Sequence, residues 1–379
     1  MKTIPVTRPF MPPKKEFEEY LNGIWQREYL TNNGPLVQEL EQKLQHYLGV
    51  ENLLFVSNGT VALQLAIKAL GLSGEVITTP FSFVATSSAI VWEHCTPVFV
   101  DIDPESFNIN PELIEEAVTE KTSAILATHV FGNPCDVEKI REIADRFGLH
   151  VIYDAAHGFG TRYRGSSIFS HGDISTTSFH ATKLFHTVEG GALMTKDRDL
   201  YERLNYMRNF GHDGPGKFNG VGINGKNSEL HAAMGLCNLG YVESILDVRE
   251  RQCRLYNQLL KGLPLARQAI RSGTHCNNSY YPVLFRDETT LLQVMGRLED
   301  EGIFPRRYFY PSLDKLDYVE SYWMEISSRL SRRVLCLPLY HDLTQSDQLF
   351  IATIIKDQLT QSYEKDLDVR RKLLTGAGY

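Results

Sequence analysis

The stretch "NLLFVSNGTVAL" (Asn52–Leu63) shows a pattern that recurs through much of the chain. An apolar run is followed by a tight turn at Gly59 and then by the start of a helical pattern. Short apolar runs alternate with longer amphipathic ones in this way from about residue 50 to residue 250. Because strands that alternate with helices build βαβ units, the sequence predicts an α/β fold with a mostly parallel sheet buried on both faces.

Helical patterns precede and follow this region. Two of them span Lys14–Leu30 and Leu36–Leu48, and a long one covers Glu229–Leu260. Beyond it, apolar and helical runs mix without regular alternation, and the charged tail is typical of a helix that frays at its glycine-containing end. We therefore expect a large domain with an N-terminal helical segment over residues 1–250, and a smaller α+β domain over residues 251–379.

The composition limits the functions open to the chain. Its 379 residues are 42% hydrophobic and carry a formal net charge of -7, which gives no general attraction for nucleic acid or an anionic membrane. The opening residues lack the apolar core of a secretory signal, and no apolar run is long enough for a membrane helix. The six cysteines form no CxxC pair, which argues against a disulfide framework or a zinc site. We expect a cytoplasmic protein without a bound metal.

Several chemically useful residues lie where predicted strands end or helices begin, which is where ligands bind in such sheets. Gly59 and Thr60 open a helix whose free N–H groups and dipole favour an anion. Phe83 follows the apolar run Glu75–Thr79, where its ring could cover one face of a flat heterocycle. Asp154 ends the apolar run of "VIYDAAH", and a carboxylate buried there needs a donor or a cationic partner.

The stretch "SFHATKLFHTVEGG" (Ser178–Gly191) adds a lysine, Lys183, in a segment with few other charges. Such a lysine can have its pKa lowered and act as a nucleophile. Each feature also has an ordinary explanation: a capped helix, a core aromatic ring, an N-cap carboxylate and a solvated amine. Together, however, an amine nucleophile, a strand-end carboxylate, an aromatic plate and a phosphate cradle are what pyridoxal phosphate requires.

In chain order, the segments NGT, DAAH, SFHATK, EGG and GINGKNSELHAAMG resemble the DegT/StrS family of nucleotide-sugar aminotransferases. The resemblance covers nearly the whole chain. It implies the type I fold of pyridoxal-phosphate-dependent transferases, with a large domain around a mostly parallel sheet and a smaller C-terminal domain. It also implies a homodimer with shared active sites, L-glutamate as the amino donor and a nucleotide-linked keto-sugar as the acceptor.

The resemblance assigns roles residue by residue. Lys183 matches the lysine that carries the cofactor, Asp154 matches the partner of the pyridine nitrogen, and His157 matches a contact on the hydroxyl side of the ring. Phe83 matches the stacking position. Further matches are Gly59, Thr60 and Ser178 at the phosphate, Asn224 at the phosphate of the other subunit, and Asn33, His186 and Tyr310 near the sugar.

The opening stretch "IPVTRPFMPP" and the later stretch "TNNGP" resemble the corresponding stretches of members that aminate carbon 4 of dTDP-4-keto-6-deoxy-D-glucose. The expected product is dTDP-4-amino-4,6-dideoxy-D-glucose, for O-antigen or another glycan. The alternative acceptor is a dTDP-3-keto-6-deoxyhexose aminated at carbon 3. Family members that act as dehydratases carry histidine at the position of Lys183, so the lysine favours transamination. A different class of function is a non-catalytic regulatory protein on the same scaffold.

Overall fold

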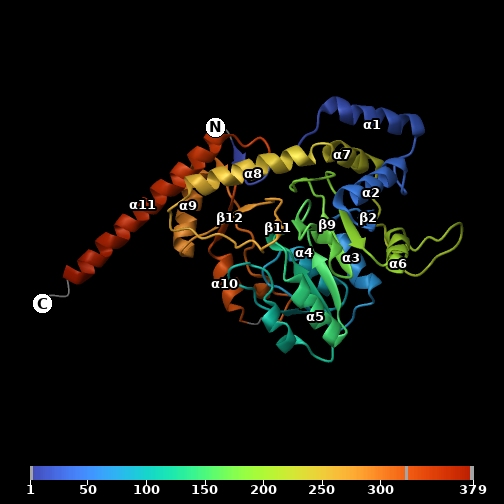
Figure 1. The fold of residues 1–379 in the computed structure, drawn as a ribbon, viewed down its shortest axis with the longest axis horizontal. Helices are drawn as coiled ribbons and strands as arrows, with labels where there is room; N and C mark the ends of the chain where they lie inside the picture. Colours follow the sequence, from blue (N-terminus) through green and yellow to red (C-terminus); the bar gives the residue numbers. More distant parts are fainter. Residues whose placement is uncertain (1–2, 321–322, 376–379) are drawn as a thin grey trace.

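The computed structural model describes residues 3–320 and 323–375, and a seven-stranded sheet lies at its centre (Figure 1). In spatial order the strands are β2 (Asn52–Val56), β10 (Gly191–Thr195), β9 (Ile174–Ser178), β6 (His150–Asp154), β5 (Thr122–Thr128), β3 (Glu75–Thr78) and β4 (Thr96–Phe99). β10 is antiparallel to both of its neighbours, and the remaining pairs are parallel. The predicted mostly parallel sheet is therefore confirmed.

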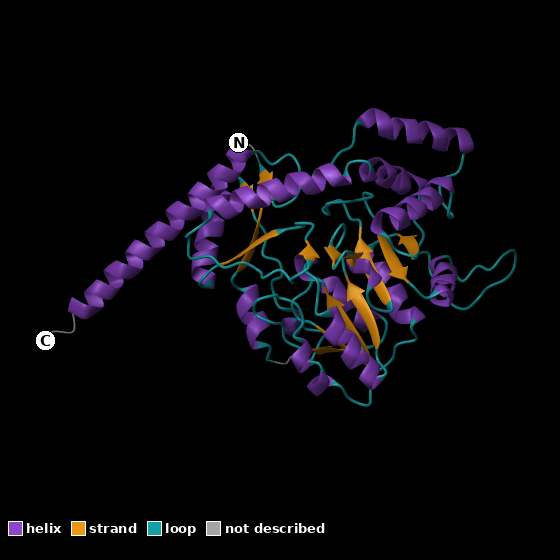
Figure 2. Cartoon of the chain, viewed as in Figure 1, coloured by secondary structure: helices purple, strands orange, loops and turns teal. Residues whose placement is uncertain are grey.

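Helices cover both faces of this sheet, and Figure 2 shows the strands gathered inside them. In β2, Leu54 and Val56 pack into one hydrophobic cluster, whereas Leu53 and Phe55 pack into another on the opposite face. Burial on both faces explains why these strands are continuous apolar runs. The first face is covered by α3 (Gly59–Ala69), α4 (Val84–Trp92) and α6 (Arg198–Arg208), and the second by α2 (Pro35–Leu48), α5 (Val137–Phe147) and α7 (Glu229–Leu239).

The predicted helices are present with adjusted ends. At the N-terminus, α1 (Lys14–Arg27) matches the first helical pattern. The long pattern Glu229–Leu260 is two helices rather than one, because α7 stops before Gly240 and α8 (Val242–Leu259) begins after Tyr241. Glycine is the poorest helix former after proline, which explains the break at this point.

A second hydrophobic core lies in the C-terminal half of the chain. It contains residues of α8 and of most of the elements that follow, and Ile4 of the N-terminal strand joins it. The elements here are β1 (Ile4–Pro5), β11 (Thr274–His275), β12 (Tyr281–Leu284), α9 (Glu288–Asp300), β13 (Ile303–Phe304), α10 (Glu325–Ser331), β14 (Val334–Leu337) and α11 (Gln345–Thr375). The division at residue 250 stays a prediction; that residue lies within α8. Residues 376–379, where the fraying end was expected, lie outside the described residues.

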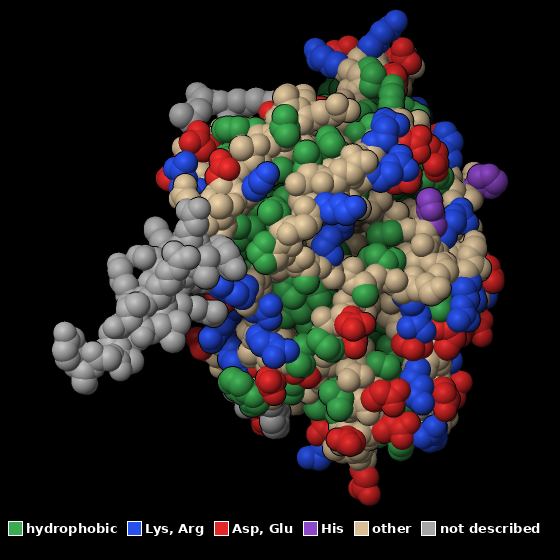
Figure 3. All heavy atoms as spheres, turned by 60° about the vertical axis from the view of Figure 1, so that its left-hand side comes forward, with side chains coloured by type: hydrophobic (Ala, Val, Ile, Leu, Met, Phe, Trp, Pro, Cys, Tyr) green, Lys and Arg blue, Asp and Glu red, His purple; other side chains and the backbone are tan. Residues whose placement is uncertain are grey.

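A small sheet separate from the central one packs against its core through the buried side chain of Tyr163. β7 (Arg162–Tyr163) and β8 (Ser166–Ser167) form a small antiparallel sheet with β11. On the face shown in Figure 3, basic and acidic side chains are interspersed, with hydrophobic patches between them. Within the described residues, no helix is both long enough and apolar enough to cross a bilayer.

Candidate active site

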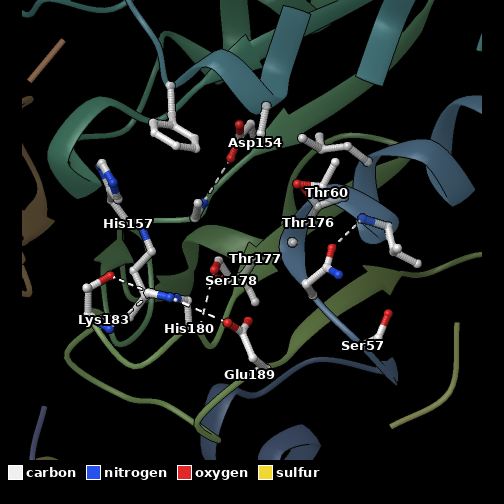
Figure 4. A pocket seen from close by; sticks show the side chains of 18 of the residues that line it. Ser57, Thr60, Asp154, His157, Thr176, Thr177, Ser178, His180, Lys183 and Glu189 are labelled. Carbon is white, nitrogen blue, oxygen red and sulfur yellow. Dashed lines mark hydrogen bonds and ion pairs between the residues drawn. The ribbon is translucent and has the colours of Figure 1, made fainter. Parts of the chain in front are cut away.

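A cavity of about 680 Å³ opens where β6 and β9 end and where α3 begins. Its size suits a cofactor together with part of a substrate. Figure 4 shows labelled side chains entering it from several separate segments. The predicted residues that line it are Gly59, Thr60, Phe83, Asp154, His157, Ser178 and Lys183.

The start of α3 forms one wall of the cavity. The Asn58 side chain accepts a hydrogen bond from the Val61 N–H at 2.8 Å and so fixes the first turn of the helix. A Cβ added to Gly59 would lie 3.0 Å from the Cβ of Ser178, and one added to Gly191 would lie 2.8 Å from the Gly59 nitrogen. The absence of both side chains keeps the helix start open, as an anion-binding backbone requires. This wall fits a phosphate group.

Asp154 is held at the end of β6 by two donors. The Ala156 N–H donates to its Oδ1 at 3.1 Å, and the Thr86 hydroxyl donates to its Oδ2 at 2.7 Å. Burial raises the pKa of the Asp154 carboxyl, while the two hydrogen bonds and the charge of Lys183 lower it. A buried carboxylate that faces a cavity suits a protonated ring nitrogen, because such a partner replaces the lost hydration.

Lys183 lies in the loop that joins β9 to β10. Its backbone N–H donates to the carbonyl of His180 at 2.9 Å, which folds the loop into a turn. Burial lowers the pKa of the Lys183 amine to about 8, the charge of Asp154 raises it, and the charge of Arg306 lowers it. A larger fraction of this amine than of an ordinary lysine is therefore neutral near pH 7, and only the neutral amine is a nucleophile.

Two rings complete the part of the site that the sequence predicted. His157 is buried and lies nearly parallel to the ring of Phe309, with centroids 5.8 Å apart. Burial and the charge of Lys183 lower its pKa, and its Nδ1 has no hydrogen-bond partner among the described residues. Phe83, at the N-cap of α4, lines the cavity with about half of its surface exposed. An exposed aromatic ring beside a cavity is available to stack on a flat ligand.

Two of the other predicted residues lie outside the lining of this cavity, on the surface. Asn224 is exposed, and its Oδ1 accepts a hydrogen bond from Lys226 Nζ at 2.7 Å. Asn33 is also exposed, in the loop before α2, where its Oδ1 lies 3.5 Å from a guanidinium nitrogen of Arg208. Neither side chain reaches the cavity within one chain.

His186 and Tyr310 are also outside the cavity lining. His186 is buried, and its Nε2 lies 2.8 Å from the carbonyl oxygen of Phe10. It therefore joins the N-terminal segment to the lysine loop. The ring of Tyr310 is covered by the guanidinium of Arg307 at 3.6 Å from the centroid. The substrate roles of both residues stay predictions, and these contacts do not support them.

The lining also contains residues that the sequence did not point to. Arg306 and Tyr308 come from the segment just before Tyr310, and the Arg306 guanidinium donates to the Tyr308 hydroxyl at 2.6 Å. Near the lysine, His180 Nε2 lies 3.5 Å from Oε1 of Glu189. In the sequence, "FPRRYFYP" signals only an arginine pair among aromatic residues, without indicating which of them faces the site. Within the described residues, no cluster of histidine, cysteine, aspartate or glutamate could hold a metal.

The profile of the DegT/DnrJ/EryC1/StrS aminotransferase family matches residues 13–356. The chain belongs to this family. It is 43% identical over 363 residues to a protein of Shigella dysenteriae named dTDP-4-amino-4,6-dideoxy-D-glucose transaminase, and 42% identical over 354 residues to one of that name from Escherichia coli. These matches cover 94% and 91% of this chain, and 99% and 95% of the two relatives.

Solved structures agree with the family. The chain is similar to DesI, whose structure was analysed in the presence of its TDP-sugar product, with a TM-score of 0.92 and 35% identity over 98% of this chain and 96% of that one. The protein is thus a pyridoxal-phosphate-dependent sugar aminotransferase with the type I fold. The cofactor fits the cavity, because an open helix start, a buried carboxylate and a lysine amine surround a single space.

Proposed function

We propose that this chain moves the amino group of L-glutamate to carbon 4 of dTDP-4-keto-6-deoxy-D-glucose and forms dTDP-4-amino-4,6-dideoxy-D-glucose. The proposal rests on a cavity that Lys183 and Asp154 share with an open helix start, in a chain 43% identical to a protein named for that sugar. A role in O-antigen or another glycan, and a cytoplasmic location, remain expectations from the sequence. The six cysteines are all free, which is consistent with a reducing compartment.

The residues of the cavity would hold the cofactor as follows. Gly59, Thr60 and Ser178 would bind the phosphate, since they surround the start of α3. Asp154 would pair with the ring nitrogen, and Phe83 would cover one face of the ring. His157 would lie beside the hydroxyl of the ring, where its neutral imidazole can accept or donate a hydrogen bond.

The chain contributes proton transfer and charge stabilisation to the reaction. When bound, pyridoxal phosphate supplies an electron sink for the negative charge that develops at the Cα of the donor. Lys183 removes the proton from that Cα as a general base and delivers it as a general acid, which its lowered pKa favours near neutral pH. Asp154, as an anion, keeps the ring nitrogen protonated. The same groups act in reverse when the keto-sugar takes the nitrogen.

Arg306 would bind the carboxylate of the amino donor. Its guanidinium lines the cavity and acts electrostatically on the Lys183 amine. Its side chain donates to the Tyr308 hydroxyl, a neutral partner, and forms no ion pair among the described residues. Glutamate brings carboxylates into this space, and a guanidinium can bind a carboxylate with two parallel hydrogen bonds.

A homodimer would complete the site through Asn224. The segment between α6 and α7, which carries this residue, extends away from the body in Figure 1. It exposes several large apolar side chains, and monomers rarely expose such a group of them without a partner. The apolar residues are Phe210, Phe218, Val221 and Ile223, with 41–77% of their surface accessible. A second copy of the chain would cover this segment and receive Asn224 at its phosphate.

The test is an assay with purified enzyme, L-glutamate and a panel of dTDP- and UDP-linked 4-keto and 3-keto sugars, with products identified by NMR. We expect amination of dTDP-4-keto-6-deoxy-D-glucose at carbon 4, and no product from Lys183→Ala. Amination at carbon 3 would instead establish the alternative acceptor. If no keto-sugar is aminated although glutamate converts the bound cofactor, the proposed acceptor class is wrong. If glutamate leaves the bound cofactor unchanged as well, L-glutamate is not the amino donor.

A further inference from the structure

Behind the cavity, three buried hydroxyl groups form a chain of hydrogen bonds that ends on Asp154. Thr128, at the end of β5, donates to the Ser82 Oγ at 3.0 Å. The Ser82 Oγ lies 2.7 Å from the Thr86 Oγ1, and the Thr86 hydroxyl donates to Oδ2 of Asp154 at 2.7 Å. None of the three hydroxyl residues lines the cavity, and all are buried. They therefore act on a ligand only through Asp154.

The direction of the protons in this chain follows from the chemistry of its ends. An ionised carboxylate can only accept, and each hydroxyl has one proton to give. Thr86 gives its proton to Asp154, so the proton between Ser82 and Thr86 must come from Ser82. The Ser82 oxygen is then free to accept from Thr128, which agrees with the geometry of that bond. All three dipoles point their positive ends toward Asp154, and hydrogen bonds aligned in this way strengthen one another.

We propose that Thr86, supported by Ser82 and Thr128, is the positioning residue that holds Asp154 as an anion aimed into the cavity. The inference rests on the proposed pairing of Asp154 with the ring nitrogen. Burial alone favours the neutral acid, which could not keep that nitrogen protonated. The hydroxyl chain opposes this effect from the side away from the cofactor. The charged and titratable groups that share the cavity with Asp154 are Lys183, His157, His180, Glu189, Arg306 and Tyr308.

The test uses holoenzyme loaded with cofactor labelled with ¹⁵N in its ring. The ¹⁵N chemical shift reports whether the ring nitrogen is protonated, and it is followed between pH 6 and 9. In the wild type the nitrogen should remain protonated throughout. Thr86→Val removes the hydroxyl with little change in volume and should lower the pKa of the ring nitrogen by about one to two units. The half-reaction with glutamate should slow by roughly tenfold to a hundredfold.

Two variants control for packing. Thr86→Ser keeps the hydroxyl and should restore the wild-type ¹⁵N shift. Thr78→Val removes a buried hydroxyl that is not part of the hydroxyl chain and that donates to the Leu126 carbonyl at 2.8 Å. This variant should leave the ¹⁵N spectrum unchanged. If Thr86→Val does not fold, Ser82→Ala takes its place; it leaves Thr86 present but unsupported, and should give a smaller shift of the same sign.

The outcomes separate this inference from the function on which it rests. A wild-type shift in both Thr86→Val and Ser82→Ala, while Asp154→Asn alters the spectrum, overturns the positioning role and leaves the role of Asp154 intact. If Asp154→Asn leaves the ¹⁵N spectrum unchanged, the proposed pairing of Asp154 with the ring nitrogen is itself wrong. Rescue by Thr86→Ser together with an unchanged Thr78→Val spectrum supports the hydroxyl chain, because a purely structural role would not follow the presence of the hydroxyl.

Discussion

Arg306 and Lys183 line the same cavity, which brings two cationic side chains to one buried space. Burial lowers the pKa of the Lys183 amine most, the charge of Asp154 raises it, and the charge of Arg306 lowers it further. The arginine comes from the C-terminal half of the chain and the lysine from the loop between β9 and β10. A cation placed beside a lysine is unfavourable unless an anion joins them. Asp154 supplies one such anion to Lys183, and a negatively charged ligand bound between Lys183 and Arg306 would be attracted by both cations.

Arg306→Gln should weaken the use of glutamate. Loss of a charge-assisted, two-pronged hydrogen bond should raise the KM for glutamate by roughly tenfold to a hundredfold. The second half-reaction, with the keto-sugar, should keep its rate, since it involves no donor carboxylate. Steady-state kinetics with each substrate varied in turn would measure both. Arg306→Lys should recover part of the loss, and Arg332→Gln, at an exposed arginine of the same half, serves as the control. An equal effect on both substrates would contradict this role.

The lowered pKa of Lys183 should be visible in the protein without cofactor. The reactivity of this amine should rise with pH around a midpoint near 8, because the neutral fraction appears there. Labelling by an amine-directed reagent at a series of pH values, read by mass spectrometry at each lysine, would measure it. Lys15 on α1 is exposed and is the internal reference. Asp154→Asn removes a charge that stabilises the protonated amine, so the midpoint should fall in that variant. A midpoint above 10 would contradict the prediction.

Asp154→Asn should separate binding of the cofactor from its chemistry. The change keeps the size of the side chain and removes the charge that holds the ring nitrogen protonated. The half-reaction with glutamate should slow by about a hundredfold or more, since each ~1.4 kcal/mol of lost transition-state stabilisation is a factor of ten in rate. The cofactor should still bind, because Lys183 and the start of α3 are unchanged. Stopped-flow absorbance measures the rate, and a near-normal value would leave Asp154 as a structural residue only.

Residues near strand ends were predictable from the sequence, because each lies beside an apolar run that marks a strand. Gly59 follows an apolar run and opens a helical pattern, and Asp154 ends another apolar run, so the ends of a parallel sheet bring them together. Lys183 was predictable as a lone lysine in a segment with few other charges that is followed by an apolar run. For these positions, local pattern and global topology agree.

Other features depend on contacts between distant segments and leave no local signal. His186 is only three residues from Lys183, yet its ring meets the carbonyl of Phe10 in the N-terminal segment. The hydroxyl chain joins Ser82 of the loop between β3 and α4, Thr86 of α4 and Thr128 at the end of β5. Each of these residues alone is an ordinary polar residue of a βα unit, so its role depends on the tertiary packing.

Sharing of the active site can be tested by mixing two inactive variants. In a shared site, Lys183 comes from one subunit and Asn224 from the other. Mixed dimers of Lys183→Ala and Asn224→Ala then contain one fully defective site and one intact site. After unfolding and refolding a one-to-one mixture at limiting cofactor, about a quarter of wild-type activity should return, because half of the dimers are mixed and half of their sites are intact. Sedimentation would verify that the recovered activity travels with the dimer.

The matched control mixes Lys183→Ala with Asp154→Asn. Both of these residues belong to the same subunit of each site, so this mixture should recover no activity. Equal recovery in both mixtures, or full activity in a sedimenting monomer, would show that Asn224 does not complete a site on its partner.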